Sequence, residues 1–318
     1  MRAFWTAVFL IWGAISWAQP KVVVSIRPIH SLTAVVMEGR GTPQLLWTGV
    51  QSPHGGALRP SEMRALREAD LVVWVGPTLE GALARPLEGI EREKVLTLLE
   101  ALPTERLLEV RRSGRWGEAH SHSHQAREAN VSEEEDLSLA TLARFDPHVW
   151  LDPLLGAEIG EHIARRLEAL DPAGAERYRE NAARLRRSLL ELDAELQERL
   201  APVRTVPYLV FHDAYQYFER RYGLNAVGAV ALDPERQPGA RRLAELRRWI
   251  AQAGVRCLFL EPQFSPRVVR VLSEGLEVAV GTLDPIGTDL KPGPELYPQL
   301  LRHLAKDLRS CLESAERR

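Results

Sequence analysis

The chain has 318 residues and a formal net charge of −2, with 41 lysines and arginines against 43 aspartates and glutamates. This near balance argues against binding to nucleic acid, which needs a strongly basic surface. The length is enough to bury a large core and to form two domains.

Residues 1–18 have the features of an export signal. A lone Arg2 precedes an apolar stretch, and Ser16 and Ala18 place small residues where a signal peptidase cleaves. A transmembrane anchor is the alternative, but spanning a bilayer takes about 20 apolar residues. The first cysteine is Cys257, so no cysteine stands at the cleavage point to carry a lipid. We therefore expect a soluble, periplasmic protein without a lipid anchor.

Residues 19–170 alternate strand and helix patterns, which predicts an α/β lobe. His54 lies in a loop just after a strand, where open α/β sheets hold ligands, although a lone loop histidine is more often a solvated bystander. His148 has apolar neighbours, so it lies either in the core or in a shielded site. The strand candidates are 21–26, 45–47 and 70–76, with a helix over 61–69.

The composition changes sharply at about residues 113–136. His120, His122 and His124 alternate with other residues, an acidic run follows, and apolar residues are almost absent. This pattern predicts a mobile insert in the first lobe. Three imidazoles in five residues indicate weak additional zinc sites, and the alternative is a solvated loop with only adventitious affinity.

Residues 171–202 predict one long helix. Apolar residues recur every three or four positions from Tyr178 to Leu200, Asp171 and Pro172 suit the first turn, and Pro202 ends the pattern. At 1.5 Å per residue such a helix is about 45 Å long, which is more than one domain needs. We interpret it as a rigid connection between two lobes, with a site built between them.

Residues 203–318 repeat the alternation and predict a second α/β lobe. His212, Glu261 and Asp284 each follow a strand, on the side where parallel sheets bind ligands. Together with His54 and His148, they include a nitrogen and oxygen set suited to zinc, but spacings this long only indicate such a site. The expected strands are 208–211, 225–232, 255–260 and 276–281, with helices over 239–254 and 266–275.

The two cysteines, Cys257 and Cys311, both lie after the long helix. Because an exported chain meets an oxidising compartment, we expect them to form a disulfide that fastens the C-terminal helix to the strand holding Cys257. The alternative is a pair of buried free thiols.

Five segments of the chain, in order, carry a family resemblance: 52–61, 146–153, 211–218, 261–264 and 282–285. They resemble the ZnuA family, the zinc-binding proteins of ABC importers, and the likeness runs from about residue 21 to residue 311. It implies two lobes of parallel strands joined by one long helix, with a metal ion in the cleft between them. The implied function is capture of Zn²⁺ as cargo and its delivery to an ABC-type membrane permease, and we expect a monomer.

The same resemblance assigns His54, His148 and His212 as metal ligands. The manganese and iron binders of the family usually have a glutamate at the position of His212, so an imidazole there favours zinc. Pro53 departs from those relatives that have a glutamate before the first histidine. Asp284 matches the aspartate that completes the site in other members, and a water molecule is the alternative fourth ligand.

The resemblance also implies that Cys257 and Cys311 match a disulfide of the C-terminal lobe. Two other functions remain as alternatives. One is a manganese or iron carrier of the same family. The other is a zinc hydrolase, in which three histidines and a water hold the metal and Glu261 serves as a base. No nucleophile motif accompanies the histidines, so we expect a carrier and not an enzyme.

Overall fold

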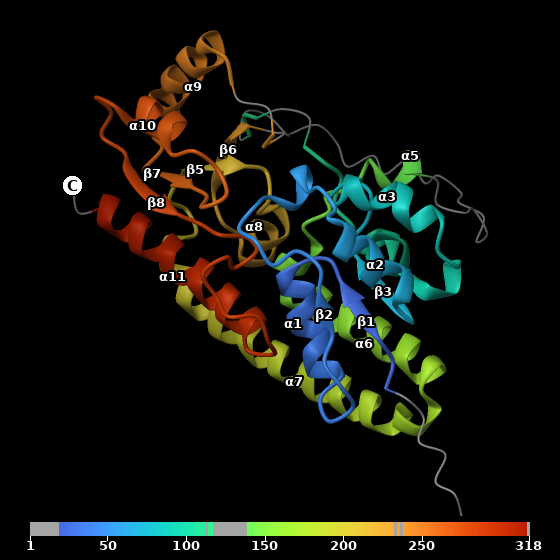
Figure 1. Ribbon diagram of the computed structural model, residues 1–318. Coiled ribbons are helices and arrows are strands. Elements are labelled where there is room, and N and C mark those ends of the chain that lie inside the picture. Colours follow the sequence, from blue (N-terminus) through green and yellow to red (C-terminus); the bar gives the residue numbers. More distant parts are fainter. Residues whose placement is uncertain (1–18, 112–113, 117–138, 232–233, 236–237, 317–318) are drawn as a thin grey trace, which may run out of the picture.

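The computed structural model describes residues 19–111, 114–116, 139–231, 234–235 and 238–316 (Figure 1). The export signal predicted at 1–18 and the insert histidines His120, His122 and His124 lie outside these residues. Within the described part of the chain, no helix combines the length and the apolar character needed to cross a membrane.

The first lobe is built on a four-stranded parallel sheet in the order β2-β1-β3-β4. Its strands β1 and β3 are buried throughout, which explains their continuous apolar runs. The three predicted strands are present, whereas β4 was missed because its short apolar run continues without a break into the helix Leu98–Ala101. The strands are β1 (Val22–Val24), β2 (Gln44–Leu45), β3 (Leu71–Trp74) and β4 (Val95–Thr97), and the helices are α1 (Arg27–Val36), α2 (Pro60–Glu68), α3 (Gly81–Glu88), α4 (Leu98–Ala101) and α5 (Leu139–Leu142).

The second lobe holds another four-stranded parallel sheet, in the order β6-β5-β7-β8. All four predicted strands and both predicted helices are confirmed. The strands are β5 (Tyr208–His212), β6 (Ala226–Ala231), β7 (Cys257–Leu260) and β8 (Ala279–Thr282), and the helices are α8 (Gln216–Tyr222), α9 (Ala240–Gln252) and α10 (Arg267–Ser273).

The long joining helix is confirmed as α7 (Ala175–Leu200), which runs along one side of the molecule (Figure 1). It begins later than predicted, because residues Pro172–Gly174 form a separate 3-10 turn that leads into it. The carboxylate of Asp171 accepts a hydrogen bond from the backbone N–H of Gly174 and another from the hydroxyl of Tyr178. Asp171 therefore caps the 3-10 turn that precedes α7, whereas α7 itself follows Gly174 without a side-chain cap.

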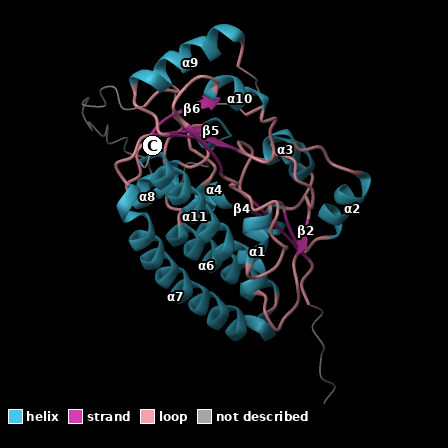
Figure 2. Cartoon of the chain, turned by 90° about the vertical axis from the view of Figure 1, so that its left-hand side faces the viewer, coloured by secondary structure: helices cyan, strands magenta, loops and turns pink. Residues whose placement is uncertain are grey.

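Helix α7 does not connect the lobes alone. Helix α6 (Pro153–Leu170) and the C-terminal helix α11 (Leu296–Glu316) both pack against it (Figures 1 and 2). Helix α11 also packs against α1 of the first lobe, where Ser31 Oγ donates to the carbonyl of Pro294. One hydrophobic cluster includes residues of both sheets and of these helices. The boundaries drawn at residues 170 and 202 stay predictions.

The predicted disulfide between Cys257 and Cys311 is confirmed, and the two Cα atoms lie 6.1 Å apart. Cys257 begins β7 and Cys311 lies in α11. The bond therefore fixes the last helix to the sheet of the second lobe.

Candidate metal centre

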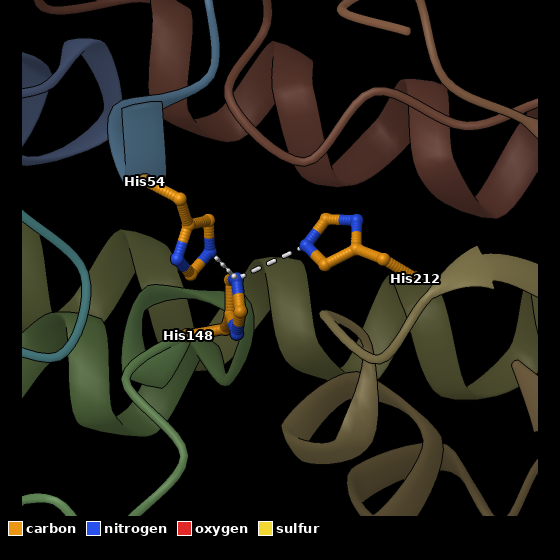
Figure 3. A group of neighbouring side chains, drawn as sticks. All are labelled: His54, His148 and His212. Carbon is orange, nitrogen blue, oxygen red and sulfur yellow. Dashed lines mark hydrogen bonds between the residues drawn. The ribbon is translucent and has the colours of Figure 1, made fainter. Parts of the chain in front are cut away.

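Three histidine side chains from separate parts of the chain converge on one point (Figure 3). The Nε2 atom of His148 lies 3.4 Å from that of His54 and 3.4 Å from that of His212. One ring nitrogen from each residue can be chosen so that all three lie within 4.8 Å of one another. This is the spacing expected of side chains that can share one metal ion.

His54 belongs to the 3-10 turn η1 (Pro53–Gly55), between β2 and α2. The hydroxyl of Ser52 accepts a hydrogen bond from the His54 backbone N–H and so caps this turn. A Cβ atom at Gly56 would lie 2.7 Å from the ring of Trp47, so only glycine lets the loop pack this closely on that ring. The loop therefore has a defined position, which directs His54 toward the other two histidines.

His148 precedes the 3-10 turn η4 (Val149–Leu151) and is almost fully buried. One carboxylate oxygen of Asp146 accepts two hydrogen bonds from it, at 2.9 Å from the backbone N and at 2.7 Å from Nδ1. Because Nδ1 then carries the hydrogen, the lone pair of Nε2 is free to bind a metal. Burial raises the pKa of Asp146 to about 7.

His212 is the last residue of β5, at the carboxyl end of the sheet. Its Nδ1 lies 2.6 Å from Oε1 of Glu261, which directly follows β7, the neighbouring strand. Both side chains are buried. Asp146 and Glu261 thus act alike, since each fixes the orientation of one imidazole from behind.

The pKa values of the three histidines differ in direction. Burial lowers the pKa of His54 and of His148 well below 6.5, and the neighbouring imidazoles lower it further. Burial is the largest single effect on His212 and lowers its pKa, but the hydrogen bond and charge of Glu261, together with the charges of Asp213 and Asp146, outweigh burial, and the net pKa is raised. A metal ion binds only the neutral ring, so His54 and His148 are in the binding form at neutral pH.

Two cavities adjoin the histidines. The smaller, of about 10 Å³, is lined by the three histidines together with Glu261, Gln263 and Phe264, among others, and has room for about one water molecule. The larger, of about 500 Å³, also reaches all three histidines and lies beside Arg111 and Asp213. The point where the histidines converge thus adjoins both a small cavity and a much wider one.

Asp284 is not part of the histidine group. Its carboxylate accepts hydrogen bonds from the Gln263 side chain, from three consecutive backbone N–H groups and from the hydroxyl of Thr288. These bonds close the loop after β8, so both oxygens of Asp284 are occupied within the protein.

Sequence reasoning missed the part played by Asp146. It stands two residues before His148, close enough for its carboxylate to reach the backbone N–H and the ring of the same residue. That spacing was the available signal. Glu261 was placed after a strand on the ligand-binding side, but the only role weighed for it was that of a catalytic base, whereas in the structure it is hydrogen-bonded to His212.

The fold and the site define a class: two-lobed, parallel-sheet proteins in which three imidazoles from both lobes converge and could hold a metal ion. A family model described as "Zinc-uptake complex component A periplasmic", ZnuA, matches residues 22–311. The chain therefore belongs to the ZnuA family.

Named relatives agree with this assignment. The chain is 39% identical over 316 residues to the high-affinity zinc uptake system protein ZnuA of Brucella abortus (strain 2308). The alignment covers 94% of each chain. It is 32% identical over 315 residues to the protein of that name from Yersinia pestis, across 98% of this chain and 97% of the relative.

Solved structures share the fold. The periplasmic zinc binding protein TroA from Treponema pallidum superposes with a TM-score of 0.74 at 21% identity, over 92% of this chain and 99% of that one. A crystal structure of ZnuA gives a TM-score of 0.72 at 24% identity, over 92% and 98%.

Proposed function

We propose that this protein captures Zn²⁺ in the periplasm through His54, His148 and His212 and delivers it to an ABC-type membrane permease. One observation carries the proposal: three buried or half-buried imidazoles converge, and carboxylates hold two of them with Nε2 toward the common centre. An all-imidazole set suits zinc better than manganese, which prefers oxygen ligands. The names of the relatives, which are zinc uptake proteins, support the same cargo.

A water molecule completes the proposed zinc site. The small cavity beside the histidines has room for about one water. Two acceptors on residues that line it, Oε2 of Glu261 and Oε1 of Gln263, are buried and make no hydrogen bond within the described part of the protein. A zinc-bound water has two hydrogens to donate to such acceptors. The alternative is direct ligation by Asp284, which would have to give up hydrogen bonds that it already accepts.

The proposed role is that of a carrier without catalytic activity. The family assignment supports this role, because the named relatives are zinc uptake proteins. A hydrolase is the competing function, and it would use Glu261 as its base, since Glu261 lines the small cavity and its Oε2 makes no hydrogen bond within the described residues. Assays of ester hydrolysis and of CO₂ hydration on the zinc-loaded protein distinguish the two functions. We expect no turnover above that of the zinc-free protein, and metal-dependent turnover would contradict the carrier role.

The proposed location and partner are those expected of a member of the ZnuA family. The signal at residues 1–18 fits export to the periplasm, and the expected partner is the permease of a zinc importer, which the monomer would meet with zinc bound. Weak zinc binding by His120, His122 and His124 stays a prediction from the sequence.

Competition titration tests the cargo. The purified, metal-free protein is titrated with zinc in the presence of a chromophoric chelator, and then with manganese under the same conditions. We expect one tight zinc ion per chain and much weaker manganese binding. Manganese binding as tight as that of zinc would instead support the alternative carrier of the same family.

A further inference from the structure

One segment of the first lobe touches both of the turns that bear buried histidines. We call residues 107–111 and 114–116 the crossing segment. At its start, the backbone N–H of Asp146 donates to the carbonyl of Leu108 at 2.8 Å. The hydroxyl of Tyr217, on α8, accepts from the Leu108 backbone N–H and donates to the Asp146 carbonyl, both at 3.0 Å. The crossing segment is therefore fixed to the turn that carries His148.

The other end of the crossing segment lies on the sheet of the second lobe. The backbone N–H of Trp116 donates to the Val227 carbonyl at 2.7 Å, and the N–H of Ala229 donates to the Gly114 carbonyl at 3.1 Å. The segment thus runs antiparallel along the outer edge of β6. A Cβ atom at Gly228 would lie 2.4 Å from the Gly114 carbonyl oxygen, so the close approach depends on glycine there.

Arg111 lies between these two attachments. Its Nη1 donates to Oδ1 of Asp213 at 2.9 Å and its Nη2 donates to Oε2 of Glu219 at 2.7 Å. Its guanidinium group lies 3.8 Å from the centre of the Trp116 ring, a cation–π distance. Asp213 directly follows His212, so Arg111 also holds the second histidine turn. The side chain of Arg111 is 24% exposed, and both carboxylates are more deeply buried.

We propose that Arg111 is a positioning residue for zinc binding, which holds the His212 turn at the correct distance from the His148 turn. The inference rests on the proposed function. Zinc–imidazole bonds are about 2.0–2.1 Å long, so a small displacement of one turn prevents its ring from bonding to an ion held by the other two. Without Arg111, two buried carboxylates lose their shared partner and the turn after β5 loses its fixed position.

The test compares Arg111→Gln with the wild-type protein by competition titration with zinc. We expect zinc affinity to fall about 10-fold or more, the lower end of the range for groups that orient ligands. The absorption bands of the cobalt(II)-substituted protein report ligand geometry directly, and we expect them to change in the variant. Asp213→Asn breaks the same link from the other side and should weaken zinc binding too. The double variant should lose little more than Arg111→Gln alone.

Arg221→Gln is the matched control. Arg221 belongs to α8, is 26% exposed, and pairs through two nitrogens with Asp193 on α7. It should lower thermal stability while leaving the zinc affinity and the cobalt bands unchanged. If Arg111→Gln does not fold, Asp213→Asn carries the test.

The outcomes separate the two proposals. A wild-type protein without tight zinc binding would refute the proposed function itself. A wild-type protein that binds zinc tightly, with unchanged affinity and cobalt bands in Arg111→Gln or in Asp213→Asn, would overturn the role of Arg111 alone.

Discussion

The Nδ1 atom of His212 lies 2.6 Å from Oε1 of Glu261, a residue 49 positions further along the chain. The contact joins the carboxyl ends of two neighbouring strands, β5 and β7, and is buried. It fixes which ring nitrogen carries the hydrogen and so leaves Nε2 facing His148, 3.4 Å away. The proposed metal site thus has two shells of side chains: an inner shell of imidazoles, which would bind the ion, and an outer shell of carboxylates, which orient the imidazoles.

Glu261→Gln tests this outer shell. An amide in place of the carboxylate weakens the hold on the His212 ring, so we expect zinc affinity to fall about 10- to 100-fold with the fold intact. Competition titration measures the affinity, and Glu198→Gln, on the exposed face of α7, is the control. Equal affinities in the two variants would show that Glu261 does not support the site.

His148→Ala tests the inner shell. Because a single side chain in a pre-formed cleft contributes little to two lobes with a shared core, the variant should fold normally and lose tight zinc binding. Circular dichroism checks the fold and chelator competition checks the affinity. His162→Ala, on α6 and outside the histidine group, should behave as wild type. Retained tight binding in His148→Ala would remove this residue from the ligand set.

Asp284→Asn tests whether Asp284 binds the metal ion or only holds the loop after β8 in place. The amide cannot accept all the hydrogen bonds that the carboxylate now accepts, and each buried donor left unpaired costs about 1–3 kcal/mol. We expect a lower melting temperature and an almost unchanged zinc affinity. The opposite pattern, a normal melting temperature with a large loss of affinity, would make Asp284 the fourth ligand.

The pH dependence of zinc binding follows from the histidine pKa values. Protons compete with zinc for neutral imidazoles, so affinity falls as the pH falls. His212, with its raised pKa, is protonated first, and His54 and His148, with lowered pKa values, take up protons only well below pH 6.5. When the logarithm of zinc affinity is plotted against pH, its slope should be about one where only His212 takes up a proton. The slope should rise toward about three in acid, where all three histidines take up protons. A slope of three already near pH 7 would contradict this order.

The raised pKa of His212 also makes the stability of the zinc-free protein depend on pH. The pair of charged His212 and Glu261 stabilises the fold at pH values below 6.5, and this contribution is lost as the pH rises through the raised pKa of His212.

Removal of the disulfide by Cys257→Ser with Cys311→Ser should lower stability without weakening zinc binding. The cysteines are separated by 54 positions, and closing a loop of that length contributes about 4 kcal/mol in the chain-entropy model. Denaturant unfolding measures the loss. An unchanged midpoint would mean that helix α11 is held by its packing alone.

Much of the fold could be predicted from the sequence because its signals are local. Continuous apolar runs predicted the strands of both parallel sheets, and the spacing of apolar residues predicted α7. Strand β4 was missed because no turn signal separates its apolar residues from those of α4, which follows at once. The packing of α11 against α1 was also not predicted, since it depends on contacts between residues far apart in the chain.

The candidate site was predicted only in part, and not from local patterns of apolar residues. His54, His148 and His212 were singled out by position and by resemblance, and the structure brings them together. Asp284 shares the same kind of position after a strand, yet its carboxylate closes a loop. Position at a strand end indicates that a side chain lies near the site, but only the hydrogen bonds around it decide what it binds.

Diffraction from zinc-loaded crystals, recorded on either side of the zinc absorption edge, shows whether the three histidines bind zinc. We expect one strong anomalous peak within about 2.0–2.1 Å of the Nε2 atoms of His54, His148 and His212, the usual zinc–imidazole distance. A fully occupied zinc position elsewhere, with these three side chains unbound, would contradict this expectation.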